Sequence, residues 1–201
     1  MKKSFKIAFL MDPLEDLDLK GDTTFALALE AQRRGHKIFF FKPSDLILKS
    51  NEVFANICKI ELSSINGVDK FKYHKNHVVP LSDYDVVMMR QDPPFDLSYI
   101  TATHILEKLP KSTLVVNNPF EVRNAPEKIF VTNFPHLMPK TLITRDMHSI
   151  HSFREEFKDI IIKPLYGNGG QGVFHVLPSD QNFNSIIEMF FNQNKEPLIL
   201  Q

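Results

Sequence analysis

Apolar positions along the chain fall into short runs that alternate with stretches of helical periodicity, which predicts an α/β fold. The run Lys6–Met11, stopped by Asp12-Pro13, predicts a buried strand. Asp22 is placed to cap a helix that ends at Arg33-Arg34-Gly35, and residues 37–41 predict a second strand. A strand, a helix and a strand within about 35 residues form a βαβ unit, in which a right-handed crossover makes the strands parallel.

The rest of the first 120 residues extends this sheet. Buried strands are predicted over 84–90 and 113–116, with a helix over 97–109 between them. Residues 53–62 are interpreted as a strand of a hairpin and residues 66–76 as a polar loop. Together these elements predict one open, mainly parallel sheet.

The pattern changes after Asn117-Asn118-Pro119, and the predicted division is into residues 1–122 and 123–201. Pro126 begins a short helix that carries Lys128. The remaining elements are predicted as strands over 141–144, 159–164, 173–177 and 197–201, and as helices over 146–157 and 182–191.

Composition narrows the class of protein. Of 201 residues 43% are hydrophobic, so a well-formed core is expected, and 24 basic side chains balance 24 acidic ones, which removes the positive charge that nucleic-acid binding needs. No segment approaches the roughly 18 apolar residues of a membrane span, so no membrane partner is expected. Cys58, the only cysteine, is predicted to be a small buried hydrophobe in a reducing, cytoplasmic setting. The pairs His74/His77 and His148/His151 lack neighbouring ligands, so no zinc site is predicted.

Four of the seven glycines lie in the segment Tyr166–Gly172, which matches the pattern G-x-G-x-x-G. A dinucleotide-binding fold requires a helix directly after this loop, but Val173–Leu177 is an extended pattern. A Walker A loop requires Lys followed by Ser or Thr after the last glycine, but Gly172 is followed by Val173. The segment is therefore predicted to be a glycine-rich hairpin whose backbone N–H groups close over a triphosphate, with Lys163 supplying a positive charge. The alternative is a flexible surface turn without a ligand.

A second candidate site is Met89–Asp96, where a strand runs into two adjacent prolines. Arg90 and Asp92 lie there at the carboxyl end of a parallel strand, the edge at which open α/β sheets bind ligands. The prolines stiffen the turn, one X-Pro bond being a candidate for the cis form, so Arg90 is held ready to bind a carboxylate. Alternatively, Arg90 and Asp92 form only a local ion pair. Asp12 stands at the exit of the first strand, either to meet a ligand's ammonium group or as an acidic loop cap.

Five segments, in order and at natural spacing, carry a family resemblance: Met11-Asp12-Pro13, Glu30-Ala31-Gln32-Arg33-Arg34-Gly35, Met89-Arg90-Gln91-Asp92-Pro93-Pro94-Phe95-Asp96, Pro126-Glu127-Lys128, and Ile162-Lys163-Pro164-Leu165 before the glycine loop. They resemble bacterial-type glutathione synthetase over the whole chain. The Lys-Pro pair and the glycine loop alone would indicate only the wider ATP-grasp superfamily.

The resemblance implies a fold, a reaction and partners. It implies an N-terminal substrate-binding domain with a Rossmann-like, pre-ATP-grasp topology over 1–122 and the first part of an ATP-grasp domain over 123–201. The implied reaction is ligation of γ-glutamylcysteine and glycine with ATP and Mg²⁺, through an acyl-phosphate, to give glutathione, ADP and phosphate. The implied assembly is a homotetramer.

The resemblance also implies roles for individual residues. Contacts to ATP are expected from Lys128, Lys163, Gly167, Asn168, Gly169, Gly170, Gln171, Gly172 and, beside the adenine, Gln201. Contacts to γ-glutamylcysteine are expected from Asp12, Arg90 and Asp92. Phosphoryl transfer depends mainly on positioning and charge neutralisation, which suits these residue types.

The sequence departs from the family pattern after Gly172. Only 29 residues follow, and their acids Asp180, Glu188 and Glu196 form no clustered pair for two magnesium ions. The metal ligands are therefore expected beyond Gln201, and the chain alone is expected to be catalytically incomplete. The strand begun at Pro197 is expected to lack partners and to leave an apolar edge exposed, with poor solubility. The alternatives are a non-catalytic nucleotide- or peptide-binding module and another ATP-grasp carboxylate-amine ligase.

Overall fold

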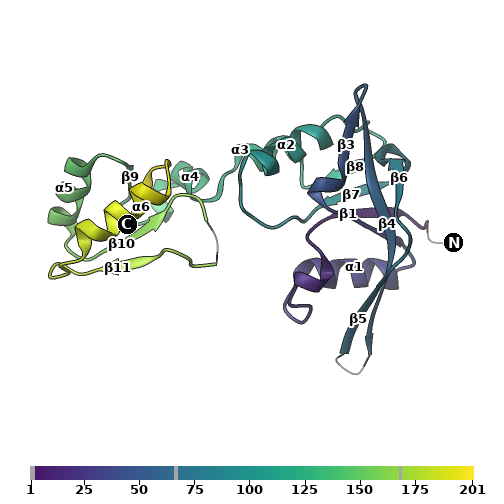
Figure 1. The fold of residues 1–201 in the computed structure, drawn as a ribbon, viewed down its shortest axis with the longest axis horizontal. Helices are drawn as coiled ribbons and strands as arrows, with labels where there is room; N and C mark the ends of the chain where they lie inside the picture. The colour runs from purple at the N-terminus through teal and green to yellow at the C-terminus, as the bar shows by residue number, and fades with distance from the viewer. Residues whose placement is uncertain (1–2, 66–67, 168) are drawn as a thin grey trace. The chain divides into compact units, whose positions relative to one another are not determined.

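The computed structural model describes residues 3–65, 68–167 and 169–201 and divides into two compact units, residues 1–124 and 125–201 (Figure 1). Each of the two units has its own β-sheet. No helix within the described ranges is long and apolar enough to cross a membrane.

The predicted βαβ unit is confirmed at the centre of the first unit. Strands β1 (Lys6–Leu10), β2 (Lys37–Phe41), β7 (Val86–Met89) and β8 (Leu114–Val116) pair in parallel. Helix α1 (Thr23–Arg33) begins at Asp22, whose carboxylate accepts a hydrogen bond of 2.6 Å from the Phe25 N–H. Helix α2 (Leu97–Leu106) begins at Asp96 in the same way, and α3 (Pro119–Asn124) follows β8. Helix α1 covers one face of the sheet and α2 the other (Figure 1).

The alternation of side chains along β1 explains why both faces are covered. Leu10 and Ala8 pack with Leu106 of α2, whereas Phe9 packs on the opposite face with Phe25 and Ala28 of α1. All of these side chains are at most 2% exposed. Successive residues of a strand point to opposite faces, so a strand that is apolar throughout must be buried on both.

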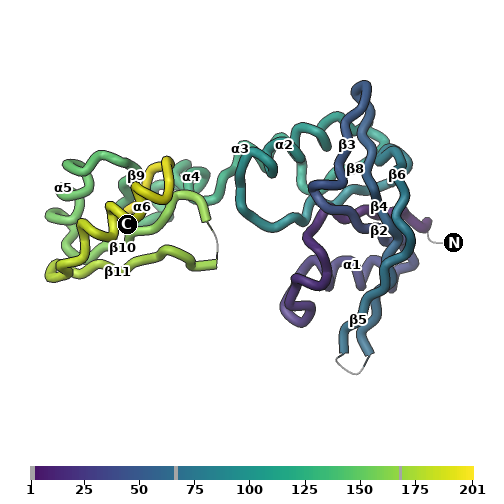
Figure 2. The backbone as a smooth tube through the Cα atoms, viewed as in Figure 1, coloured from purple at the N-terminus to yellow at the C-terminus, as the bar shows by residue number. Residues whose placement is uncertain are grey.

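The stretch 45–80 contains more strands than predicted, although the hairpin strand predicted over 53–62 is confirmed within Glu52–Ile65. It forms four strands, β3 (Leu46–Lys49), β4 (Glu52–Ile65), β5 (Val68–Tyr73) and β6 (His77–Pro80), and β3, β5 and β6 all pair antiparallel with β4 (Figure 2). The polar loop predicted over 66–76 is therefore wrong for Val68–Tyr73. Because β4 also pairs antiparallel with β2, the sheet is less parallel than predicted.

The second unit is a four-stranded antiparallel sheet packed with helices. Its strands are β9 (Leu142–Thr144), β10 (Ile160–Pro164), β11 (Phe174–Val176) and β12 (Leu198–Leu200). Helices α5 (Met147–Phe157), capped by Asp146, and α6 (Phe183–Gln193) share a core with this sheet, and α4 (Glu127–Phe130) begins after Pro126 as predicted. Strands β10 and β11 pair across the glycine-rich segment, which confirms the predicted hairpin.

The apolar edge predicted at the last strand is wrong. Strand β12 lies between β10 and β9, and its residues Leu198, Ile199 and Leu200 are at most 2% exposed. Its backbone is paired on both sides, so the expected unpaired apolar edge does not exist at this strand.

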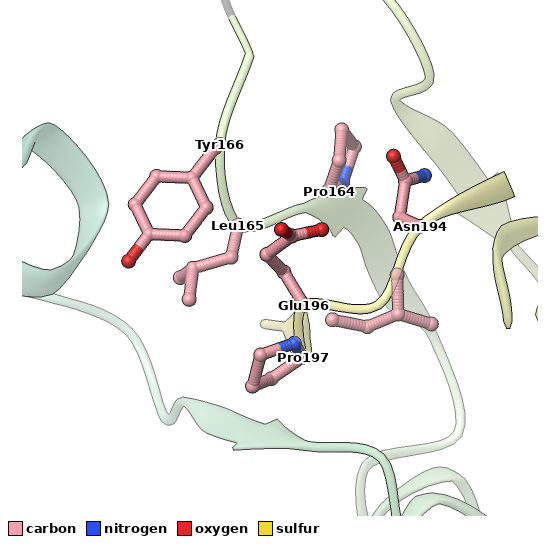
Figure 3. Close-up of a pocket in the computed structure, with 7 residues that line it drawn as sticks. Pro164, Leu165, Tyr166, Asn194, Glu196 and Pro197 are labelled. Atoms are coloured by element: carbon pink, nitrogen blue, oxygen red, sulfur yellow. The ribbon is translucent and has the colours of Figure 1, made fainter. Parts of the chain in front are cut away.

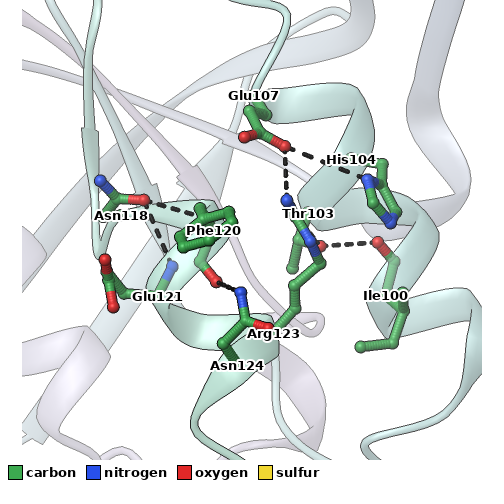
Figure 4. Close-up of polar contacts among 9 residues, drawn as sticks. All are labelled: Ile100, Thr103, His104, Glu107, Asn118, Phe120, Glu121, Arg123 and Asn124. Carbon is green, nitrogen blue, oxygen red and sulfur yellow. Dashed lines mark hydrogen bonds and ion pairs between the residues drawn. The ribbon is translucent and has the colours of Figure 1, made fainter.

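Hydrogen bonds and an ion pair connect α3 to α2 at the end of the first unit (Figure 4). The Arg123 guanidinium donates to the Glu107 carboxylate at 2.7 Å and to the Thr103 hydroxyl at 3.5 Å. Its side chain is 13% exposed, against 42% for Glu107. Since Arg123 is nearly covered, the pair is less screened by water than a surface ion pair.

Replacing Arg123 with methionine is expected to destabilise the first unit by about 1–2 kcal/mol, because the Glu107 carboxylate loses its charged partner. Arg33→Met is the matched control, since Arg33 is 75% exposed and lies 3.7 Å from Glu30. Urea unfolding of both variants measures the difference. Equal midpoints for the two variants would show that Arg123 contributes no more than a surface pair.

Candidate functional site

Three residues predicted from sequence meet at the carboxyl ends of β1 and β7. Asp12 follows β1, whereas Arg90 and Asp92 follow β7, and the two strands are neighbours in the sheet. The Asp12 carboxylate accepts a hydrogen bond of 2.8 Å from the Asp92 backbone N–H, so Asp12 does cap a loop. The bond between Pro93 and Pro94 is cis.

The Arg90 guanidinium is held by two hydroxyl groups from α1. Its Nε donates to Thr24 Oγ1 at 3.0 Å and its Nη2 to Thr23 Oγ1 at 2.7 Å. Among the residues that the structure describes, no carboxylate lies within ion-pair distance of Arg90, so the local ion pair with Asp92 is not formed. Sequence reasoning missed both threonines, because hydroxyl residues in the first turn of a helix are ordinary there.

The electrostatics around Asp92 are unfavourable to its charged form. Partial desolvation and the nearby carboxylates of Asp12 and Asp22 raise the pKa of Asp92, while the positive charge of Arg90 opposes the shift. A bound cation such as an ammonium group would relieve this accumulation of negative charge. The cluster therefore offers the Arg90 guanidinium to a ligand's carboxylate and, next to it, the Asp12 and Asp92 carboxylates to a ligand's ammonium group.

The raised pKa of Asp92 makes the stability of the first unit pH-dependent. The folded state binds the Asp92 proton more tightly than the unfolded state does, so the resulting stabilisation is present below the ordinary Asp pKa of 3.8 and is lost as the pH rises through the raised value. Asp92→Asn is therefore expected to raise the melting temperature at pH 7, with a smaller gain at pH 3. Melting curves at both pH values, with Asp69→Asn as the charge-removal control, measure this; a gain that grows on acidification would contradict it.

A groove of about 340 Å³ opens beside Pro13, next to the cluster, and reaches Phe40, Cys58 and Tyr73. Its volume is in the range of ligand pockets. The Tyr73 hydroxyl is already engaged, since it accepts from the Leu14 N–H and donates to Glu15. Burial raises the pKa of the Cys58 thiol to about 11, so the thiol stays protonated and acts as the small buried hydrophobe predicted.

The predicted phosphate-binding residues come together in the second unit. Lys163 lies in β10, and Lys128 of α4 donates from Nζ to the Gly167 carbonyl at 2.8 Å. Desolvation and the neighbouring charge of Lys163 lower the pKa of Lys128, with Glu127 opposing the shift. Two like charges are thus gathered at the start of the glycine loop, an arrangement that an anion would stabilise.

The backbone of the loop requires glycine at several positions. Gly167, Gly169, Gly170 and Gly172 all have positive φ. At Gly172, with φ of +68°, an added Cβ would also meet Phe190 and Pro164 at 3.3 Å. Gln171 is exposed, and Asn168 lies outside the described residues.

Gln201 extends strand β12 towards a larger cavity. Its backbone pairs in both directions with Ile161, and its side-chain Nε2 donates to Thr141 Oγ1 at 3.1 Å. Thr141 belongs to the wall of a cavity of about 410 Å³, lined by Thr132, Pro135, Met138, Pro139, Lys140, Thr141 and Ile143. Such a volume accommodates a heteroaromatic base. Sequence reasoning missed this wall, since its residues form an ordinary short strand and its approach.

A smaller cavity lies beside the start of the glycine loop. Residues from the end of β10 and from the approach to β12 surround it, among them Pro164, Tyr166 and Glu196 (Figure 3). Its volume of about 40 Å³ is close to that of one water molecule. It is too small for a nucleotide, whereas the cavity at Thr141 is large enough for a base.

No group of three or more His, Cys, Asp or Glu side chains in the described ranges is arranged to hold a metal ion, so these residues offer no ready-made cage of protein ligands for a divalent cation.

Comparison with known proteins gives matches over nearly the whole chain. Residues 5–123 match the family model "Prokaryotic glutathione synthetase, N-terminal domain", and residues 127–201 match "Prokaryotic glutathione synthetase, ATP-grasp domain". The chain is 50% identical over 201 residues to a glutathione synthetase of Agrobacterium fabrum and 52% identical over 196 residues to that of Mesorhizobium japonicum. These alignments cover 100% and 98% of the chain but only 63% and 62% of the relatives.

Solved structures share the fold. A RimK domain ATP-grasp protein from Sphaerobacter thermophilus aligns with a TM-score of 0.58 at 17% identity, over 98% of this chain and 63% of its own. D-alanyl-alanine synthetase A from Vibrio cholerae aligns with a TM-score of 0.58 at 14% identity, over 99% of this chain and 59% of its own. At such identities the likeness establishes the ATP-grasp type of fold alone.

Proposed function

The chain belongs to the prokaryotic glutathione synthetase family, and from this premise we propose that it serves the ATP-dependent ligation of γ-glutamylcysteine to glycine. In this reaction the cysteinyl carboxylate attacks the γ-phosphorus of ATP, giving an acyl-phosphate and releasing ADP. The glycine amine then attacks the acyl carbon, phosphate leaves, and the amine loses a proton. The observation that carries the proposal is the 2.8 Å hydrogen bond from Lys128 Nζ to the Gly167 carbonyl, which brings this lysine to the glycine loop that follows Lys163 of β10.

The second unit supplies the groups for the nucleotide. Lys128 and Lys163 neutralise phosphate charge, and the loop from Gly167 to Gly172 presents backbone N–H groups to the phosphates. The cavity at Thr141, tied to Gln201 by a hydrogen bond, receives the adenine. Gly169, Gly170 and the exposed Gln171 belong to the part of the loop that closes over the phosphates.

The first unit supplies the groups for the dipeptide. Among the described residues no carboxylate lies within ion-pair distance of Arg90, although Asp92 is near enough for the charge of Arg90 to act on its pKa, and Asp12 is hydrogen-bonded to the Asp92 backbone. A γ-glutamyl group carries a free carboxylate and a free ammonium group on one carbon, which matches this pair of opposite charges. Family membership is also the ground for expecting Mg²⁺ with the ATP, a homotetramer and a cytoplasmic location.

The test is phosphate release from ATP in the presence of Mg²⁺, γ-glutamylcysteine and glycine. The 201-residue chain is compared with the longer product of the same reading frame, if the genome encodes one. Release that depends on both γ-glutamylcysteine and glycine, with glutathione detected by mass spectrometry, is the expected result for the longer product. Binding of ATP without release in either form would favour a nucleotide-binding module, and release with another amine acceptor would favour a different carboxylate-amine ligase.

A further inference from the structure

The two threonines that hold Arg90 differ from ordinary helix-capping residues. Thr24 is 3% exposed, yet it belongs to the first turn of α1, where its hydroxyl accepts from Arg90 Nε. The first turn itself is capped by Asp22, so neither threonine is needed for that role. Arg90 is fixed from its backbone as well, because its N–H donates to the Leu10 carbonyl at 2.7 Å.

The identity of the bonded nitrogens shows which edge of the guanidinium is left. Nε and Nη2 lie on the side edge of the planar group, and both donate to threonine. Of the five N–H donors, the two on Nη1 and one on Nη2 remain, and one from each nitrogen forms the end edge. This end edge has the parallel geometry that binds a carboxylate through both oxygens.

The acceptors on the side edge are neutral, which matters for binding. A carboxylate there would cancel the positive charge of Arg90, whereas a hydroxyl group leaves it intact for a ligand. An arginine side chain loses rotamer freedom when it binds, and two hydrogen bonds formed beforehand reduce that loss. Thr23 and Thr24 therefore orient the group without neutralising it.

We propose that Thr23 and Thr24 are positioning residues, which turn the Nη1–Nη2 edge of Arg90 towards the carboxylate of a ligand's free α-amino-acid group. The inference rests on the proposed function, since the glutamyl end of γ-glutamylcysteine carries such a group. It predicts discrimination by charge at that carboxylate, with Asp12 and Asp92 facing the ammonium group of the same carbon.

The test combines two ligands with three forms of the protein. Calorimetry measures binding of γ-glutamylcysteine and of the analogue whose glutamyl α-carboxylate is a carboxamide. The protein is the unaltered chain, the isosteric pair Thr23→Val with Thr24→Val, and the conservative pair Thr23→Ser with Thr24→Ser. The unaltered and serine forms are expected to prefer the acid at least tenfold. The valine form is expected to lose most of that preference, by binding the acid about tenfold more weakly and the amide nearly as before.

The outcomes separate the inference from the function. If the valine form weakens both ligands equally or keeps the preference, the threonines are structural and the inference is overturned. If the unaltered chain binds the dipeptide with no preference for the acid, the inference fails but the proposed substrate stands; if it binds neither ligand, both fail.

Two further measurements address a valine form that folds poorly. The ¹⁵N resonance of Arg90 Nε–H is expected to move on Thr24→Val in the absence of ligand. Arg90→Lys, which keeps the charge but removes the forked edge, is expected to reduce the preference while the threonines stay in place. An unmoved resonance, or a preference that the lysine form keeps undiminished, would contradict the proposal.

Discussion

Replacing Lys163 with methionine is expected to weaken ATP binding at least tenfold, which corresponds to about 1.4 kcal/mol. Lys163 lies in β10 at the entry to the glycine loop, and its charge acts on Lys128, whose pKa it helps to lower. Two cations held together with one of them partly desolvated are costly without an anion, so the phosphates gain from both. Calorimetric titration of the chain with ATP measures the loss.

A comparison among lysines makes this expectation specific. Lys128→Met removes the proposed phosphate contact and also the 2.8 Å hydrogen bond to the Gly167 carbonyl, so it is expected to weaken binding as much as Lys163→Met. The double replacement is expected to remove measurable binding. Lys195→Met removes an exposed charge beyond α6 and serves as the control. If all three single variants bound ATP alike, the lysine pair would have no part in nucleotide binding.

Local signals in the sequence were sufficient for much of the fold. Asp22, Asp96 and Asp146 each precede a helix, and each carboxylate accepts from the backbone N–H three residues later. The apolar runs that form β1 and β7 have apolar residues on both faces, and such a strand is stable only where both faces of the sheet are covered. These features depend on neighbours in sequence, so one sequence reveals them.

The errors arose where a distant partner decides the structure. Val68–Tyr73 looks polar because Lys70 and Lys72 alternate with Phe71 and Tyr73, but those two aromatic side chains pack against Ile60 and Leu62 of β4. Half of a strand's residues face solvent, so such a segment reads as a loop until its partner is known. The position of β12 was missed for the same reason, since nothing near Pro197 shows that β9 lies beside it.

The charged residues of the candidate site were predictable from the sequence, but the hydroxyl residues that hydrogen-bond to the site's side chains were not. Arg90, Asp12, Lys128 and Lys163 stand at strand ends or beside prolines and glycines, where functional side chains are recognisable. Thr24 and Thr141 are small hydroxyl residues in ordinary elements, and their importance depends on which side chain reaches them across the fold. Contacts of this kind are set by topology, which a single sequence does not display.

The largest effect on stability is expected at the strand whose position was missed. Leu200 is fully buried in β12, where it pairs with Ile162 of β10 and Leu142 of β9. Its side chain joins the core that α5 and α6 cover. Truncating a buried leucine removes apolar contacts and leaves a cavity, so Leu200→Ala is expected to cost about 2–5 kcal/mol.

Leu177→Ala provides the control for this effect, because Leu177 lies in the same unit and is 47% exposed. Its loss is expected to be well below 1 kcal/mol, since surface substitutions rarely cost more. Hydrogen exchange at the amides of Ile162 and Ile199 reports on the second unit itself, even if the two units unfold separately. Fast exchange at both amides in the Leu200 variant and slow exchange in the Leu177 variant would show that the stability of the second unit depends on the buried side chain of its central strand. Similar rates in the two variants would mean that Leu200 lies at an edge, where its side chain could be removed without leaving a cavity.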